Sequence, residues 1–414
     1  MRDYEAFSRP LYVMAKPAGS SCNMRCPYCY YLEKERIYSE DEKTHEMDDA
    51  LLERFTKDFI QSQTASTVLF VWHGGEPLLR PLSFYRQALR YQRMYAGGRH
   101  IDNCIQTNGT LITEEWARFF AMHHWLVGIS IDGPREYHDS YRCFRGGRPT
   151  YERVLRGMRL LDRFGVEWNA MATVNGRNAE HPMEFYHFFK DIGCRYIQFS
   201  PVVERIHRHG DGRHLASPDE DADNGALAPF SVDAEAYGRF ICAIFDEWVR
   251  EDVGKTYIQL FDATLARWMG EVPGVCSMAE TCGHAGVIEY NGDVYSCDHF
   301  VFPEYRLGNI REKSLTEMMY SPAQKAFGNA KRAGLPRQCR ECRFLFACNG
   351  GCPKDRFCTT MDGERGLNYL CPAFKAFFSH VSPYMDFMVN ELRAHRPPAN
   401  VMQWAKGFGQ AETV

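Results

Sequence analysis

Short apolar segments alternate with amphipathic stretches from residue 10 to about residue 200. The last amphipathic stretch has a helical period in its apolar residues, which are Phe185, Phe188, Phe189 and Ile192. Because strands that alternate with helices form parallel sheets, this pattern predicts an α/β fold that is either barrel-like or doubly wound. The predicted strands are Leu11–Lys16, Val68–His73, Asn103–Thr107, Val127–Ile131, Glu167–Thr173 and Tyr196–Ser200, and the predicted helices lie near 48–62, 81–95, 113–122, 150–164 and 182–191.

Distinctive motifs directly follow four of the predicted strands. In parallel sheets, ligands and catalytic groups collect at the carboxyl ends of the strands. The agreement at four strands in succession therefore predicts one functional edge of the sheet. The motifs are Cys22–Cys29, Gly74-Gly75-Glu76-Pro77, Thr107-Asn108-Gly109 and Ser130-Ile131-Asp132-Gly133.

The first motif holds three cysteines, Cys22, Cys26 and Cys29, in the spacing C-x3-C-x2-C. A cubane [4Fe–4S] cluster is normally held by four thiolates, so three leave one iron open to bind another group. A zinc knuckle or structural thiols are the alternative. Zinc usually needs a fourth Cys or His nearby, and none follows within the next dozen residues. The triad therefore favours a cluster with an open iron.

The composition indicates a globular chain with no electrostatic preference for nucleic acid or membrane. Its 414 residues are 45% hydrophobic, and 49 basic residues against 53 acidic ones give a net charge of −4. No apolar run approaches the length of a membrane span, and the first residues lack the apolar core of a signal peptide. We therefore expect a cytoplasmic protein that contacts neither nucleic acid nor membrane.

Sixteen cysteines in a reducing compartment are poor candidates for disulfides. Eight of them cluster between residues 276 and 371, enough for two four-cysteine metal sites. Zinc ribbons remain an alternative, although the glycine pair beside Cys352 would let backbone approach a bulky cluster. Five further cysteines are expected to be buried free thiols: Cys104, Cys143, Cys194, Cys242 and Cys358.

The triad and its flanks resemble the radical S-adenosylmethionine (SAM) superfamily, and the second cysteine field resembles the SPASM domain of peptide-modifying members. From about residue 10 to 395 the ordered motifs resemble anaerobic sulfatase-maturating enzymes. This resemblance implies a partial (β/α)6 barrel over 1–232, a helical bridge over 233–274, a SPASM domain over 275–395 and a tail over 396–414. The motifs are Ala15-Lys16-Pro17, Cys22–Tyr31, Gly74–Pro77, Gln106–Thr110, Ser130–Pro134, Asn291–His299 and Leu307-Gly308-Asn309.

The resemblance also implies three [4Fe–4S] clusters and SAM. Besides the triad, one auxiliary cluster would be held by Cys276, Cys282, Cys297 and Cys352, and the other by Cys339, Cys342, Cys348 and Cys371. SAM would be bound by Tyr28, Gly74, Gly75, Ser130, Arg142 and Val203. For the glycines a simple tight turn is the alternative, and for Arg142 it is a solvated surface side chain.

By the same resemblance, the enzyme oxidises an active-site Cys or Ser of a sulfatase to Cα-formylglycine. A 5′-deoxyadenosyl radical would remove a hydrogen from Cβ, and Asp298 would act as the base; the alternative is that Asp298 only accepts a loop hydrogen bond. The implied partners are an unfolded sulfatase segment of the type C/S-x-P/A-x-R and a reducing electron donor such as flavodoxin or ferredoxin. Another SPASM-type maturase that crosslinks a ribosomal peptide is the alternative function.

One residue departs from the family pattern, and one stretch of the chain carries no motif. Many family members have Gln before the glycine pair where this chain has His73, a position that could contact the substrate. Residues 204–231 are polar and rich in Gly, Asp and His, and are predicted to form a long surface loop.

Overall fold

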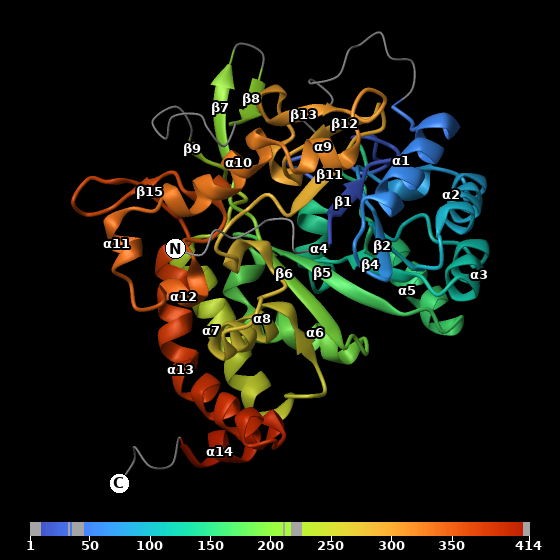
Figure 1. The fold of residues 1–414 in the computed structure, drawn as a ribbon. Coiled ribbons are helices and arrows are strands. Elements are labelled where there is room, and N and C mark those ends of the chain that lie inside the picture. The colour runs from blue at the N-terminus through green and yellow to red at the C-terminus, as the bar shows by residue number, and fades with distance from the viewer. Residues whose placement is uncertain (1–9, 32–33, 35–44, 210–211, 217–225, 409–414) are drawn as a thin grey trace. The chain divides into compact units, whose positions relative to one another are not determined.

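The computed structural model describes residues 10–31, 34, 45–209, 212–216 and 226–408. The chain divides into two compact units, and Figure 1 shows the elements of both. The first unit comprises Met1–Ser130, Asp139–Trp168 and Cys282–Ala330. The second unit comprises Ile131–His138, Asn169–Thr281 and Lys331–Val414.

The first unit is built on a sheet with the strand order β4-β3-β2-β1-β11-β12-β13. The five strands from β4 to β11 pair in parallel, and β12 and β13 continue the sheet antiparallel. Residues far along the chain thus complete a sheet that the N-terminal residues begin. The strands are β1 (Tyr12–Ala15), β2 (Thr67–Trp72), β3 (His100–Thr107), β4 (Leu126–Ser130), β11 (Ala285–Ile288), β12 (Asp293–Tyr295) and β13 (Arg306–Asn309).

Helices α1 (Asp49–Gln61), α2 (Leu82–Tyr95) and α3 (Glu114–Met122) lie together on one side of strands β1 to β4 (Figure 1). Helix α1 begins where the Asp48 side chain accepts a hydrogen bond from the amide of Leu51, which caps its N-terminus. Its apolar face, including Phe55 and Phe59, packs against Phe70 of β2. This aromatic core fixes the helix against the sheet and leaves the carboxyl ends of the strands to build the site.

The second unit contains the parallel strands β5 (Trp168–Val174), β6 (Tyr196–Pro201) and β10 (Tyr257–Ile258). Four helices form most of its core: α6 (Pro182–Asp191), α7 (Ala234–Glu251), α8 (Gln259–Met269) and α13 (Cys371–Arg393). Phe245, Phe261 and Phe377 join α7, α8 and α13 through ring contacts of 5.2–6.0 Å. Phe245 meets the other two rings edge to face, and Phe261 stacks on Phe377. These aromatic contacts hold the three helices together.

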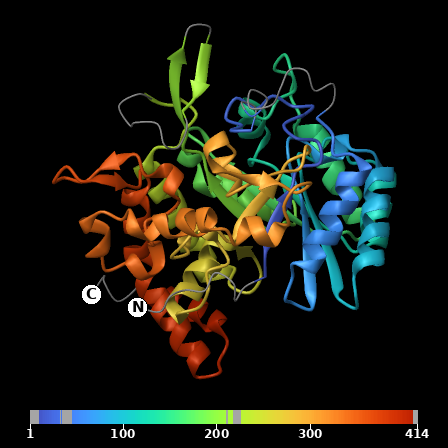
Figure 2. The same cartoon turned by 45° about the horizontal axis from the view of Figure 1, so that its top comes forward.

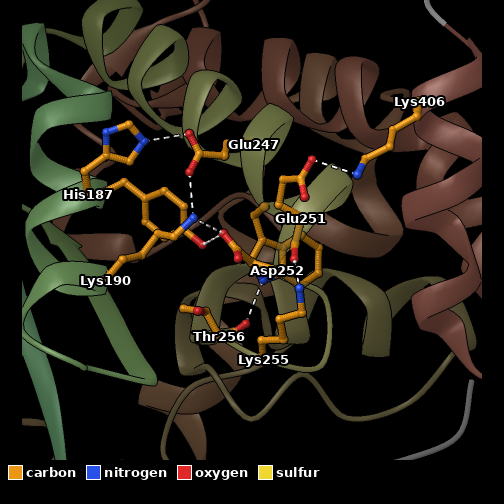
Figure 3. Close-up of polar contacts among 10 residues, drawn as sticks. His187, Lys190, Glu247, Glu251, Asp252, Lys255, Thr256 and Lys406 are labelled. Carbon is orange, nitrogen blue, oxygen red and sulfur yellow. Dashed lines mark hydrogen bonds and ion pairs between the residues drawn. The ribbon is translucent and has the colours of Figure 1, made fainter.

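A polar network joins α6 to the end of α7 (Figure 3). Lys190 on α6 donates to Glu247 and to Asp252, both at 2.8 Å, and His187 pairs with Glu247 at 2.7 Å. Burial opposes ionisation of Glu247, but its bonds to Lys190 and His187 lower its pKa below the ordinary value. The network therefore holds an ionised pair between two helices of the second unit.

The six predicted strands and the five predicted helices all occur, with ends shifted by at most a few residues. The predicted loop at 204–231 is wrong in part, because β7 (Arg205–His209), β8 (Gly212–Leu215) and β9 (Ala226–Leu227) form an antiparallel sheet there. Figure 2 shows β7 and β8 as a projecting ribbon. Polar strands with little to bury lack the apolar alternation on which the prediction depended. Residues 210–211 and 217–225 of this stretch lie outside the described residues.

The stretch predicted as a tail contains the helix α14 (Val401–Phe408), whose Trp404 packs on Tyr384 and Phe387 of α13. The remaining helices are α4 (Arg135–Tyr141), α5 (Tyr151–Arg163), α9 (Leu315–Met319), α10 (Pro322–Ala333), α11 (Arg337–Arg340) and α12 (Leu345–Cys348), and the remaining strands are β14 (Cys358–Thr359) and β15 (Arg365–Leu367). Among the described residues, no helix is long and apolar enough to cross a membrane.

Candidate active site

The loop of Cys22, Cys26 and Cys29 follows β1 and is fastened to the end of β3. The side-chain amide of Asn108 donates to Cys22 Sγ at 3.7 Å and to Asn23 Oδ1 at 2.8 Å. The backbone amide of Met24 donates to Cys22 Sγ at 3.3 Å. Hydrogen bonds to sulfur are typical of thiolates that hold iron–sulfur clusters.

Burial, and next the charge of Glu76, raise the pKa of Cys22 to about 12. The Cys29 thiol lies near enough that its charge also raises the pKa of Cys22. The Cys22 thiol would ionise readily only beside a strong positive charge such as a bound metal. The residues present therefore fit a cluster held at this loop.

The glycine pair after β2 is required by close packing rather than by a turn alone. A Cβ on Gly75 would lie 2.1 Å from the carbonyl oxygen of Ser21. The Gly75 amide donates to Gly19 O, and the Glu76 amide donates to Ser21 O, both at 2.8 Å. Gly74 has φ of +127°, which side chains of L-residues rarely adopt. The pair thus presses the end of β2 against the cysteine loop.

Four other predicted SAM-binding residues remain, and two of them, Tyr28 and Arg142, lie together at the same loop. Tyr28 is buried, and the guanidinium of Arg142 lies 5.6 Å from its ring centre. Arg142 is only 8% exposed, so the alternative of a solvated surface arginine is wrong. Ser130 ends β4 and accepts a hydrogen bond from Gln106 at 3.0 Å. Val203 is buried in the second unit, where its carbonyl accepts from Lys354 at 2.6 Å.

Polar side chains follow three neighbouring parallel strands at the same level of the sheet. Lys16 follows β1, His73 follows β2 and Glu289 follows β11. The His73 amide donates to Ala15 O at 2.8 Å, and the Lys16 amide donates to Ile288 O at 2.9 Å. Because side chains at one level of a parallel sheet point to the same face, these three lie in a row.

Asp298 joins this row from the short turn after Cys297. Lys16 Nζ lies 2.6 Å from Asp298 Oδ1, and the Tyr30 hydroxyl donates to Asp298 Oδ2. Lys16 Nζ also lies 3.2 Å from His73 Nδ1, which accepts from the Gly74 amide at 2.8 Å. With Nδ1 accepting, the ring proton of His73 is at Nε2.

The charges in this network are set by burial and by Lys16. Burial opposes ionisation of Asp298, but the Lys16 ammonium holds the pKa of Asp298 well below its usual range. Burial, and next Lys16, lower the pKa of His73 to about 3, so this ring is neutral. Burial raises the pKa of Glu289 to about 8, and the Tyr31 hydroxyl donates to it. Asp298 is therefore the ionised carboxylate of the group.

Sequence reasoning assigned no role to Lys16, Tyr30 or Glu289. The available signal was a lysine that ends an apolar strand, because a buried ammonium needs a nearby acceptor or carboxylate. The carboxylate that pairs with Lys16 could not be identified from the sequence, because β1 and β11 are far apart along the chain and become neighbours only in the folded sheet.

The thiols of Cys339, Cys342, Cys348 and Cys371 come together in the second unit, near enough for their charges to interact. Burial raises the pKa of Cys348 to about 12, and burial raises that of Cys371 to about 11. Among the described residues, no group of three or more His, Cys, Asp or Glu side chains is arranged for a single metal ion. Cys339 lies in α11, Cys342 in the loop after it, Cys348 at the end of α12 and Cys371 at the start of α13. Together these four thiols fit the larger cluster that the family resemblance implied.

The other predicted ligand set is divided between the units. Cys282 and Cys297 belong to the first unit, and Cys276 and Cys352 belong to the second. Of the five cysteines outside the scheme, Cys194 is buried and the other four are partly buried. Burial raises the pKa of Cys104 to about 12 and that of Cys242 to about 11, as expected for protonated thiols.

Comparisons with known proteins show the family and the domains of the chain. Residues 17–189 match the radical SAM superfamily model, and residues 280–343 match the SPASM iron–sulfur cluster-binding domain. The chain is 62% identical over 403 residues to a serine-type anaerobic sulfatase-maturating enzyme of Bacteroides thetaiotaomicron, covering 97% of each chain. It is 31% identical over 377 residues to a cysteine-type enzyme of Clostridium novyi, covering 89% of this chain and 95% of the relative.

The fold is similar to the solved structure of native anSMEcpe with bound AdoMet and Kp18Cys peptide. The TM-score is 0.80 at 29% identity, and the match covers 92% of this chain and all of that one. The mixed α/β architecture with a parallel sheet, a radical SAM domain and a SPASM domain is thereby confirmed.

Proposed function

The chain belongs to the family of anaerobic sulfatase-maturating enzymes, and we propose that it oxidises a Ser or Cys side chain of a sulfatase segment to Cα-formylglycine. The single observation that carries the residue-level proposal is the ion pair of Asp298 with the buried Lys16 at the carboxyl edge of the sheet. The 62% identity to a serine-type relative supports serine as an accepted substrate.

The triad Cys22, Cys26 and Cys29 would hold the cluster that binds SAM, and the two sets of four cysteines would hold the auxiliary clusters. When bound, these groups supply the radical that removes a hydrogen from the substrate Cβ and an acceptor for the electron that remains. The protein must then hold the substrate, take one further proton and keep water away.

Asp298 would take the proton of the substrate hydroxyl or thiol at a carboxylate oxygen. Its ionised state depends on Lys16, because burial alone would raise the pKa of Asp298. The Tyr30 hydroxyl donates to Oδ2, which orients the carboxylate. A base is effective only when such contacts hold it within hydrogen-bond reach of its proton.

SAM would be held by Tyr28, Gly74, Gly75, Ser130 and Arg142, with Val203 as an adenine contact. Support comes from the burial of Arg142 beside the Tyr28 ring, since a planar and permanently charged guanidinium suits a carboxylate. The close packing of Gly75 on Ser21 supports a backbone surface at which a ligand could approach the cysteine loop.

The proposed partners are an extended sulfatase segment of the type C/S-x-P/A-x-R and a reducing donor such as flavodoxin or ferredoxin. Peptides named Kp18Cys and Cp18Cys are bound in the related anSMEcpe structures, which supports the first of these. We place the enzyme in the cytoplasm, where a reducing environment keeps thiols available for clusters.

The test is anaerobic incubation of the reconstituted protein with SAM, a reductant and paired peptides that differ only in Ser or Cys. Mass spectrometry should detect the aldehyde in at least one peptide, together with 5′-deoxyadenosine. SAM cleavage without change in either peptide would leave the superfamily assignment standing and refute the proposed substrate.

A further inference from the structure

A buried lysine fastens the segment that begins with Cys276. Lys331 lies in the last turn of α10 and is 1% exposed. Its ammonium donates to the carbonyl oxygens of Cys276 and Ser277 at 2.9 Å and of Ala279 at 2.5 Å. An ammonium has three donors, and burying its charge is costly unless they are satisfied. These three contacts therefore hold both the lysine and the short 3-10 turn Cys276–Met278.

A second cation connects the same region to the segment before Cys352. Arg356 donates from Nη1 to the carbonyl oxygen of Lys331 at 2.5 Å, and from Nε and Nη2 to Gly350 and Asn349 at 2.9 Å. The Asn349 side chain donates to the carbonyl oxygen of Met278 at 2.9 Å. The segments of two proposed cluster ligands are thus joined within one unit.

We propose that Lys331 is a positioning residue for the auxiliary cluster assigned to Cys276 and Cys352, and that its charge raises the reduction potential of that cluster. The inference rests on the proposed function, which supplies the assignment of the ligands. Net charge and hydrogen bonding near a cluster set its potential. A buried cation stabilises the reduced, more negative state more than the oxidised state, which favours a cluster that must accept an electron from the substrate.

The experiment uses the full-length protein with Cys22, Cys26 and Cys29 replaced by alanine, so that only auxiliary clusters remain. In this background Lys331→Gln removes the charge and keeps a donor, and Lys331→Arg keeps the charge. Lys325→Gln, at an exposed position of α10, is the matched control. Iron content and potentiometric titration followed by electron paramagnetic resonance are measured for each.

We expect the reduction equilibrium of one auxiliary cluster to shift about tenfold against reduction in Lys331→Gln, which is about 59 mV for a one-electron couple. Lys331→Arg and Lys325→Gln should stay near the parent value. If Lys331→Gln instead lacks about four irons that Lys331→Arg retains, rescue by the charged variant also supports the positioning role.

A full iron content with an unchanged potential in Lys331→Gln would overturn the proposal. This result is separable from a failure of the proposed function, which the formylglycine assay of the unaltered enzyme measures independently. A parent protein that makes no formylglycine but shows the Lys331-dependent potential refutes the substrate and leaves the present inference standing.

Discussion

Replacing Lys16 with methionine should disable the proposed base while leaving SAM cleavage intact. Methionine keeps most of the buried volume and removes the ammonium that lies 2.6 Å from Asp298 Oδ1. The Lys16 side chain is fully buried and that of Asp298 is 19% exposed, so water cannot replace the lost partner completely. The variant also loses the contact between Lys16 Nζ and His73.

The size of the effect follows from the separation of the two charges. At 2.6 Å and an effective dielectric constant of about 20, the attraction is about 6 kcal/mol in favour of the ionised carboxylate. Burial acts in the opposite direction and remains in the variant. The pKa of Asp298 must therefore rise when Lys16 is removed. Since a carboxylate with a raised pKa takes up its proton at higher pH, the acidic limb of peptide oxidation should move toward neutral pH.

The assay compares aldehyde formation with 5′-deoxyadenosine release across a range of pH. Loss of a general base usually costs about 10²–10⁴ in rate, and we expect peptide oxidation to fall by at least about 100-fold at the acidic end. Lys57→Met, the same change at an exposed residue of α1, is the control. A Lys16→Met profile that matches the unaltered enzyme, or a parallel loss of SAM cleavage, refutes the reasoning.

Three further predictions concern the base, the glycine pair and the second unit. Asp298→Asn should keep about twelve irons and cleave SAM, yet lose peptide oxidation by at least about 100-fold; near-normal aldehyde yield would contradict the assignment. Gly75→Ala places a Cβ 2.1 Å from Ser21 O and should weaken SAM binding measured by equilibrium dialysis, whereas Gly407→Ala, with open space around it, should not. Lys190→Met should lower stability by about 1–3 kcal/mol, seen as a lower thermal midpoint. Because the pKa of Glu247 is lowered in the fold, that difference should shrink as pH falls through the folded-state pKa, and a constant difference would refute it.

The strands could be predicted because each is an apolar run bounded by a helix, and burial of such runs is decided locally. Strand β3 shows where this reasoning ends. Its predicted start was Asn103, but pairing with β2 begins at His100, in a stretch where Ile101 is flanked by polar residues and gives only a weak apolar signal. The parallel pairing of β1 with β11 could not be predicted, because periodicity describes faces and not partners.

The residues of the candidate site that belong to sequence motifs could be predicted. The contacts that depend on which strands are neighbours in the sheet could not. The cysteines and the glycine pair are visible as spacing, and the family pattern identified Asp298. The states of Asp298 and Glu289 follow from distances to Lys16, which no pattern in the sequence contains. Lys16 lies 2.6 Å from Asp298 and holds the pKa of that carboxylate low, whereas at Glu289 burial outweighs the attraction of Lys16 and raises the pKa to about 8.

The proposed base reaches the site through strands that the C-terminal half of the chain adds to the first sheet. Strand β11 pairs with β1 along its whole length, and β12 leads directly to Cys297 and Asp298. A shift of one residue in the pairing of β1 with β11 would turn Lys16 to the opposite face and away from Asp298. The register of that pair therefore determines whether the carboxylate is ionised. The cysteine-rich part consequently supplies more than cluster ligands, since without residues 282–330 the first unit lacks three strands and the base itself.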